Sequence, residues 1–415
     1  MRIEEAVTTQ EEVEDWAGEL YVLKGRLQGC FRRVEVRERA MGYIKGLLSS
    51  VERKNGWQLA EVMGEATPDG TQRLLNGSVW DVEGVRQAMV SWVVEEVGSP
   101  DGVLVIDETG ILKKGEHSAG VKRQYSGTAG RIENCQIGVF IAYASQEAYT
   151  LLDRELYLPE DWVKDGERRA AAGIPDGVAF ATKPVLARQM LERAFAAGVP
   201  AGWVTGDSIY GSDGKLRHFL EERAQAYVLA VTKAQAVWYG IEQQSVETLS
   251  ATVSDSGWQT LSCGQGAKGE RLYDWSLVML PRGLPAEGFF AAVLTRRNLS
   301  DGELAYYLVF APLETPLSTL VRVAGSRWKV EDCFELAKGE VGLDQYEVRH
   351  WSGWYRHVTL SMLALAFLTI IRHRASLDQL PKKRHGRPPV AHRRPQHSRN
   401  PTPARPPNLD RPSLA

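Results

Sequence analysis

Two short apolar runs, each followed closely by an aspartate, constrain the fold of this chain more than any other feature of its sequence. Residues 103–106 (Val-Leu-Val-Ile) precede Asp107, and residues 203–205 (Trp-Val-Thr) lie just before Asp207. Short runs of apolar and β-branched residues bounded by glycine predict buried β-strands. The pattern therefore predicts two strands that deliver their carboxylates to one edge of a sheet.

A third acid, Glu331, lies in a stretch with helical periodicity. At 100° per residue, Arg327, Glu331 and Lys338 fall within about 40° of one another, on a stripe that borders the apolar face of the predicted helix. Two strand-end aspartates and a helical glutamate can form an oxygen cage for a pair of divalent cations, and such a cage supports phosphodiester hydrolysis and strand transfer on nucleic acid. Arg327 and Lys338 would supply the positive charges that flank a metal-bound phosphate.

Each of these acids also has an ordinary structural interpretation. An aspartate after a strand often starts a turn by bonding its own backbone, and a charged helical stripe can be a solvent-exposed face with ion pairs. The occurrence of all three together favours the metal site. Glu108 should face the other way from Asp107 along the strand, so we assign it a supporting role. Asp153, which ends another apolar run and precedes Arg154, is the main competitor as a metal ligand.

The spacing of apolar runs and turn residues predicts an α/β fold. We expect strands at 102–107, 135–145, 148–157, 202–206 and 226–231, with helices at 183–198 and 213–224. Further strands at 289–295 and 305–311 precede helices at about 316–342 and 351–374. Three leading strands followed by alternating helices suit an RNase H-like fold, which is a mixed sheet flanked by helices on both faces.

Five segments follow from these patterns. They are a helical N-terminal domain (1–98), the first part of the catalytic core (99–235), a glycine-containing β-rich insertion (236–288), the second part of the core with the helix of Glu331 (289–375), and a Pro/Arg-rich tail (376–415). The tail has nine prolines in the 35 residues beyond Leu380. Because that composition cannot form a core, we expect the tail to be disordered.

The N-terminal segment contains a pattern similar to a helix-turn-helix. Residues 57–64 predict a helix that Gly64 closes, and Thr67 with Pro68 predicts the N-cap and first position of a second helix that carries Arg73. Such a pair of helices is typical of a domain that binds DNA ends, although an ordinary helical hairpin has the same pattern.

Charge and hydropathy are unevenly distributed along the chain. The formal net charge is −2, yet the segment from Arg372 onward holds eleven lysines or arginines and two aspartates. A basic tail favours a polyanion partner, although a solvated charged segment is the more common explanation. The longest apolar run, residues 358–371, has about 14 residues, which indicates a buried helix rather than a membrane span. Four widely spaced cysteines without a CxxC pair suit a reduced, cytoplasmic protein.

Several long motifs in this chain carry a family resemblance. They are VLVIDETG and GWVTGDSIYG around the aspartates, SRWKVEDCFELAK around Glu331, and the segments VRERAMGYIKGLLSSVERKNGWQLAE, DETGILKKGEHSAGVKRQYSGTAGRIENCQIGVF, DRELYLPEDW and AKGEVGLDQYEVRHWSGWYRH. In this order, over roughly residues 30–372, they resemble the DDE transposases of the IS4-like class, most closely the IS701 family. The C-terminal signature of that class has Tyr, Arg, Glu and Lys at fixed spacing. Arg327, Glu331 and Lys338 fit it, whereas Ala324 stands at the Tyr position.

The resemblance implies a DNA transposase with an RNase H-like catalytic core. Asp107, Asp207 and Glu331 would hold two Mg²⁺ ions, with Mn²⁺ able to substitute. The enzyme would bind the terminal inverted repeats of an insertion sequence in double-stranded DNA, cleave there and join the ends to target DNA. It would act as a homodimer in a synaptic complex, in the bacterial cytoplasm at the nucleoid, with no membrane partner. The alternatives are a metal-dependent nuclease without strand transfer and a DNA-binding regulator derived from a decayed transposase.

Basic and aromatic residues outside the acidic triad are candidates for contacting DNA. A basic loop follows Asp107, and its side chains either contact the DNA backbone or cover a solvated hairpin tip. The candidates for DNA contact are Arg327, Lys338, Lys113, Lys114, Lys122, Arg123 and Arg73. Trp238, Trp258 and Trp275 are candidates for stacking on an unpaired base, as in hairpin-forming members of the IS4-like class, although most tryptophans are core residues.

Overall fold

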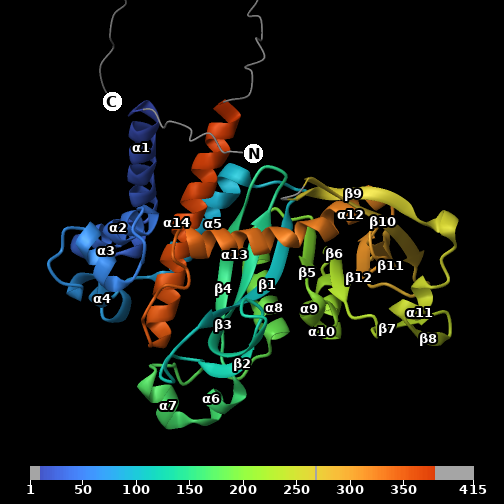
Figure 1. The fold of residues 1–415 in the computed structure, drawn as a ribbon, viewed down its shortest axis with the longest axis horizontal. Helices are drawn as coiled ribbons and strands as arrows, with labels where there is room; N and C mark the ends of the chain where they lie inside the picture. Colours follow the sequence, from blue (N-terminus) through green and yellow to red (C-terminus); the bar gives the residue numbers. More distant parts are fainter. Residues whose placement is uncertain (1–9, 267–268, 379–415) are drawn as a thin grey trace, which may run out of the picture.

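The computed structural model describes residues 10–266 and 269–378, and one large mixed β-sheet flanked by helices lies at its centre (Figure 1). The strands of this sheet are β1 Val103–Leu112, β2 Lys122–Ser126, β3 Arg131–Ala144, β4 Tyr149–Tyr157, β5 Trp203–Gly206, β6 Ala226–Val231, β9 Gln259–Gly266, β10 Gly269–Met279, β11 Phe289–Arg297 and β12 Leu304–Pro312. They pair in the order β2-β3-β1-β5-β6-β12-β11-β10-β9, with β4 also paired to β3. The predicted α/β fold with a mixed sheet is confirmed.

The two apolar runs form strands β1 and β5, and β1 lies between β3 and β5 in the sheet. It pairs antiparallel with β3 and parallel with β5, and β5 pairs parallel with β6. β1 does not end at Asp107 but continues to Leu112, because the long strand β3 offers it a paired backbone over all ten residues from Val103 to Leu112. Thr109 and Gly110, where a turn was expected, are therefore part of the strand.

The far half of the sheet comes from residues after β6. β12 pairs antiparallel with β6, and β11, β10 and β9 follow in turn. The segment 236–288, which was expected to be β-rich, supplies β9 and β10 to this same sheet. It also forms a separate hairpin of β7 (Ala236–Tyr239) and β8 (Glu242–Ser245), followed by the short helix α11 (Val246–Ser250) and the 3₁₀ turn η2 (Asp255–Gly257). The boundaries of the five segments stay a prediction.

Helices cover both faces of the sheet (Figure 1). They include α8 Lys183–Ala196, α9 Ser208–Gly211, α10 Gly214–Glu221, α12 Leu317–Ser326, α13 Trp328–Gly339 and α14 Trp351–Asp378. α8, α9 and α10 contact one another on one face, and α12, α13 and α14 follow one another on the other. The rings of Phe140 in β3 and Phe334 in α13 pack edge to face, with centroids 5.4 Å apart.

The segment 316–342, which was predicted as one helix, is divided at Arg327 into α12 and α13. Gly325, near the end of α12, packs closely on β9: a Cβ added to it would lie 2.1 Å from the carbonyl oxygen of Cys263. α12 contacts β1, β5, β6 and most extensively β9, whereas α13 contacts β1, β3 and β4. Because a sheet twists from strand to strand, one straight helix could not follow both regions. The break places Arg327 at the corner between them.

The N-terminal part is helical, as predicted, with α1 Gln10–Arg26, η1 Gln28–Cys30, α2 Val34–Leu48, α3 Gly56–Val62, α4 Asp69–Asn76 and α5 Val82–Val97. The side chain of Asn55 caps α3 by accepting two backbone N–H groups, and Gly64 follows α3 with φ of 74°. The N-cap of α4 is Pro68 and not Thr67, whose hydroxyl donates to Asp69 at 3.1 Å.

Helix α14 packs against α2, α4, α5 and β4. By length and composition its apolar stretch could cross a membrane, but 72% of that window is buried inside the structure. It is therefore a core helix, as the run 358–371 indicated. Its length and apolar composition are only weak evidence for a membrane span. Two short helices, α6 (Glu160–Lys164) and α7 (Gly166–Ala171), follow β4. Most of the predicted tail, residues 379–415, lies outside the described residues.

Candidate active site

Asp107 and Asp207 stand at the same level of neighbouring strands. In the parallel pairing of β1 with β5, Ile106 lies opposite Gly206, so each aspartate is the next residue along its chain. Asp207 also caps α9 by accepting a backbone N–H at 2.8 Å. Asp107 is opposite Phe140 in β3, and residues opposite each other in an antiparallel pair share a face. Because Phe140 packs against α13, Asp107 points to the α13 side of the sheet.

Burial and mutual repulsion disfavour the charged forms of these two carboxylates. Burial, and then the charges of Asp207 and Glu108, raise the pKa of Asp107 to about 7. Burial and the charge of Glu108 also raise the pKa of Asp207 above its usual range. A bound cation would stabilise both anions, and oxygen ligands of this kind suit hard divalent ions. The donor set therefore fits a divalent metal.

Glu331 pairs with Arg327 instead of joining the two aspartates. Its side chain is 54% exposed, and its Oε1 lies 3.2 Å from Nη1 of Arg327. The positive charge of Arg327 also counteracts the rise in the pKa of both Asp107 and Asp207, which places the guanidinium near all three acids. Among residues 10–266 and 269–378, no three His, Cys, Asp or Glu side chains are grouped closely enough to hold a metal ion. Three acids repel one another without a cation, so this open arrangement is the one that electrostatics favours.

Glu108 is held on the opposite side of β1. Its carboxylate accepts the Tyr210 hydroxyl at 2.5 Å and the Lys183 amino group at 2.6 Å. Tyr210 belongs to α9, three residues after Asp207, and Lys183 begins α8. Glu108 therefore ties both helices to the strand of Asp107, as expected for a supporting residue that alternates with it.

Lys338 points back to the strand of Asp107. Its Nζ donates to the hydroxyl of Thr109 at 2.8 Å and to the hydroxyl of Thr128 at 3.0 Å. Thr109 is in β1, and Thr128 lies in the turn between β2 and β3. The amino group is thus engaged within the protein, and burial lowers the pKa of Lys338.

The basic residues after β1 are not equally accessible. Lys113 turns inward: its Nζ lies 3.0 Å from the carbonyl oxygen of Tyr346 and 3.5 Å from the centre of that ring. Its assignment as a DNA contact is therefore corrected, because Tyr346 already occupies the amino group. Lys114, Lys122 and Arg123 are exposed. Arg73, in α4, is exposed as well.

One of the three tryptophans considered for base stacking is excluded by its position. Trp275 is fully buried in β10, and its Nε1 donates to the carbonyl oxygen of Leu261 at 3.3 Å. The alternation of side chains along β10 turns it into the core, so no base can reach it. Trp258 is half-buried with the Arg297 guanidinium 4.3 Å from its ring. Trp238 is 58% exposed on β7.

A cluster of arginines and aromatic rings beside Arg327 was not predicted from the sequence. Trp328 stacks on Tyr273 of β10, with centroids 6.3 Å apart, and the guanidinium groups of Arg271 and Arg296 lie 4.6 and 5.5 Å from the Trp328 ring. The Nε of Arg296 is buried without a hydrogen-bond partner in the described part of the chain. The adjacency of Arg327 and Trp328 was the one local signal for this cluster, since its other members come from distant strands.

An open groove of about 670 Å³ runs from Asp207 to this cluster. Its lining includes Asp207, Ser208, Lys233, Glu247, Arg296, Tyr306, Tyr307 and Arg327. The groove carries three cations and two acids, and Lys233 already pairs with Glu247 at 3.3 Å, so Arg296 and Arg327 are the cations that would attract a polyanion to it.

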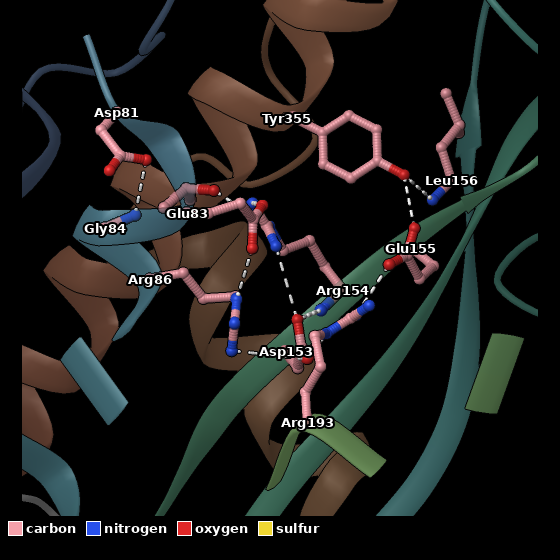
Figure 2. A network of polar contacts seen from close by, with 11 residues as sticks. Asp81, Glu83, Gly84, Arg86, Asp153, Arg154, Glu155, Leu156, Arg193 and Tyr355 are labelled. Atoms are coloured by element: carbon pink, nitrogen blue, oxygen red, sulfur yellow. Dashed lines mark hydrogen bonds and ion pairs between the residues drawn. The ribbon is translucent and has the colours of Figure 1, made fainter. Parts of the chain in front are cut away.

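Asp153 belongs to a buried ion network and not to the candidate metal site (Figure 2). Its carboxylate lies 2.9 Å from Arg193, 3.4 Å from Arg154 and 3.6 Å from Arg86, and its side chain is 4% exposed. Arg86, Arg154 and Arg193 already surround this buried carboxylate, which leaves it no open position for a metal ion. Asp153 is therefore a structural residue.

Comparisons with known proteins agree with this geometry. Residues 26–255, more than half of the chain, match the family model of the DDE superfamily endonucleases, and the match includes Asp107 and Asp207. The chain belongs to this family. It is also 24% identical over 316 residues to the "Probable transposase for insertion sequence element IS701" of Microchaete diplosiphon, a match that covers 74% of this chain and 75% of that protein. The resemblance to IS701-like DDE transposases is thereby confirmed.

Proposed function

We propose that this protein is a DNA transposase that binds the terminal inverted repeats of an insertion sequence, cleaves the DNA at those ends and joins them to target DNA. The observation that carries the proposal is the pairing of Ile106 with Gly206, which brings Asp107 and Asp207 side by side in a DDE superfamily endonuclease. The similarity to a probable IS701 transposase favours strand joining over cleavage alone.

Two Mg²⁺ ions, with Mn²⁺ able to substitute, suit the acids of this site. DDE superfamily endonucleases generally use divalent metals. Asp107 and Asp207 are partly buried carboxylates whose raised pKa values favour a cation partner, and Glu331 would complete the set by leaving Arg327. When bound, such a metal pair stabilises the attacking and leaving oxygens of an in-line phosphoryl displacement.

The residues of the chain would have distinct tasks around that centre. The sheet presents Asp107 and Asp207 on paired strands, so little reorganisation is needed before reaction. Arg327, once released from Glu331, would hold a phosphate through its planar pair of N–H donors. The groove between Asp207 and Arg296 would guide the reacting strand.

The DNA outside the reaction centre would meet exposed cations on several elements. Lys114, Lys122 and Arg123 project near β2, and Arg73 projects from α4. Trp238 and Trp258 stay candidates for base stacking. Because two transposon ends must be processed together, we propose a homodimer in the synaptic complex, acting in the cytoplasm at the nucleoid.

A mini-transposon assay tests this function. The unmodified protein and Asp207→Asn are incubated with Mg²⁺, a supercoiled target plasmid and duplex DNA that carries the repeats found beside the reading frame. We expect nicks at the repeat ends and plasmid-joined products with the unmodified protein, and neither product with Asp207→Asn. Cleavage without joined products would favour a nuclease, and repeat-specific binding without cleavage would favour a regulator.

A further inference from the structure

The hairpin of β2 and β3 presents an apolar pair of side chains to solvent. Tyr125 of β2 and Ile132 of β3 lie directly opposite each other and are 64% and 60% exposed. Opposite residues of an antiparallel pair share a face, so the two side chains form one patch. We propose that this face of the hairpin contacts double-stranded DNA beside the bond that is cleaved, with Tyr125 and Ile132 against the sugars and Arg123 on a phosphate. This inference rests on the proposed function.

The two faces of the hairpin have opposite character. Arg123 lies two residues before Tyr125 and therefore shares its face, and it is exposed as well. On the other face, Ser126 is 1% exposed and Cys135 is fully buried. The hairpin thus packs on the protein through one face only, and the core does not need Tyr125 or Ile132.

The hairpin lies close to the candidate metal site. Ser126 packs so tightly on Gly110 of β1 that no Cβ would fit there, and the Thr128 hydroxyl donates to the carbonyl oxygen of Gly110 at 3.2 Å. Gly110 is three residues beyond Asp107, which is about 10 Å along a strand. Successive phosphates of one DNA strand are about 3.4 Å apart along the helix axis, so a duplex with its scissile bond at Asp107 would meet the hairpin about three to six base pairs away.

Charge favours DNA as the partner of this face. Residues 113–134 hold five lysines or arginines and two glutamates, in a chain whose formal net charge is −2. Arg131 and Lys122 already pair with neighbouring acids, at 2.8 and 3.1 Å. Arg123 has no ion pair within the described residues, so its guanidinium is available beside the apolar patch. A cation next to apolar groups suits a phosphate next to its sugars.

An open groove of about 490 Å³ continues this face beyond Arg123. Its lining includes His117, Lys122, Arg123, Asn134 and Arg168. The Asn134 amide, opposite Arg123, donates to the carbonyl oxygens of Lys113 and Gly115 at 2.7 and 2.9 Å, which fixes the loop before β2. A groove that is ordered before DNA arrives loses less entropy on binding.

Hydroxyl-radical footprinting tests whether this face lies on DNA. The probe is duplex DNA that carries the repeats found beside the reading frame, bound without divalent metal so that it stays uncut. With the unmodified protein we expect protected sugars about three to six base pairs from the scissile bond. The double variant Tyr125→Thr with Ile132→Thr should lose that protection and keep the rest of the footprint. Threonine suits an exposed strand, so the hairpin should still fold, which thermal melting checks.

The matched control is Leu313→Thr. Leu313 is 60% exposed and follows β12 at the end opposite to the groove of Asp207, so this variant should bind DNA like the unmodified protein. We expect the double variant to bind the duplex about three- to thirtyfold more weakly, with an unchanged slope of log affinity against log salt. Arg123→Gln should lower that slope by about one, because one phosphate contact is lost. An unchanged footprint and affinity in the double variant would overturn the proposal.

A second copy of the chain is the competing occupant, because β2 is at one end of the strand order and an edge strand can pair with another chain. In that case the double variant would change the sedimentation of the DNA-free protein and leave the footprint intact, which would also overturn the proposal. Absence of cleavage by the unmodified protein in Mg²⁺ would count against the proposed function, while the footprint would still decide the role of the hairpin.

Discussion

Arg327 and Glu331 form an ion pair of 3.2 Å at the break between α12 and α13. The pair keeps one acid away from Asp107 and Asp207, while the guanidinium acts electrostatically on both of them. Because Glu331 is more than half exposed, the pair contributes little to stability and can exchange partners readily. A divalent cation among the acids would release Glu331 to the metal and Arg327 to the DNA.

Replacement of Arg327 should therefore separate metal binding from DNA processing. In Arg327→Gln, Glu331 loses its competing partner, so we expect Mn²⁺ affinity to increase about two- to fivefold, the range of an exposed ion pair. Cleavage should nevertheless fall at least tenfold, because the phosphate contact is lost. Titration calorimetry with Mn²⁺ and single-turnover cleavage measure the two effects. Weaker Mn²⁺ binding in this variant would contradict the competition.

The three acids should be required for cleavage but not for folding. Asp107→Asn, Asp207→Asn and Glu331→Gln each remove an anionic ligand with little change in volume, so we expect cleavage to fall at least about a hundredfold while DNA binding persists. Mg²⁺ at a hundred times its Kd should stabilise the unmodified protein by about 2.7 kcal/mol, and each variant less. Thermal melting with and without Mg²⁺ measures this. A variant with near-normal cleavage would remove that residue from the metal site.

Asp153 should show the opposite behaviour. Asp153→Asn leaves the guanidinium groups of Arg86, Arg154 and Arg193 without their shared carboxylate, and removal of one partner from a buried ion network costs about 3–5 kcal/mol. We expect a large loss of the unfolding free energy measured with urea, and an unchanged Mg²⁺ affinity per folded molecule. Asp207→Asn is the matched control and should unfold nearly as the unmodified protein does.

Glu108 and Tyr210 should be energetically coupled. Glu108→Gln or Tyr210→Phe removes a hydrogen bond to a charged group, which contributes about 1.5–3 kcal/mol. In a double-mutant cycle followed by urea unfolding, we expect a coupling of about 0.5–3 kcal/mol. Additive effects would mean that the 2.5 Å contact does not hold α9 to β1.

His357 should make stability depend on acid pH. It is fully buried, its Nδ1 lies 2.8 Å from the Tyr43 hydroxyl, and burial, with a smaller effect of the Lys113 charge, lowers its pKa to about 4. The unfolded chain binds a proton near pH 6.5, so stability from this group is complete above that pH and is lost as the pH falls towards 4. The total is about 3 kcal/mol. We expect the slope of unfolding free energy against pH, measured from pH 7 to 4, to differ between the unmodified protein and His357→Gln by the equivalent of up to one bound proton. Identical slopes would contradict this.

The sequence alone determined the features that depend on local composition and period. The runs before Asp107 and Asp207 are apolar and β-branched, and they form buried strands that are direct neighbours in the sheet. The helical periodicity around Glu331 and the apolar run at 358–371 likewise produced helices at those positions. The long motifs around the acids were sufficient to identify the family. The role of the three acids as metal ligands stays a prediction.

Only the tertiary structure decided where each side chain of these elements points and what it meets. The predicted helix is divided at Arg327, close to where Gly325 packs on β9, and contacts with distant residues turn Lys113 towards Tyr346 and Trp275 into the core. The register of β1 against β5, and not the spacing of a hundred residues between the aspartates, puts Asp107 beside Asp207. These outcomes depend on packing between segments far apart in the chain, and local propensity carries no information about such partners.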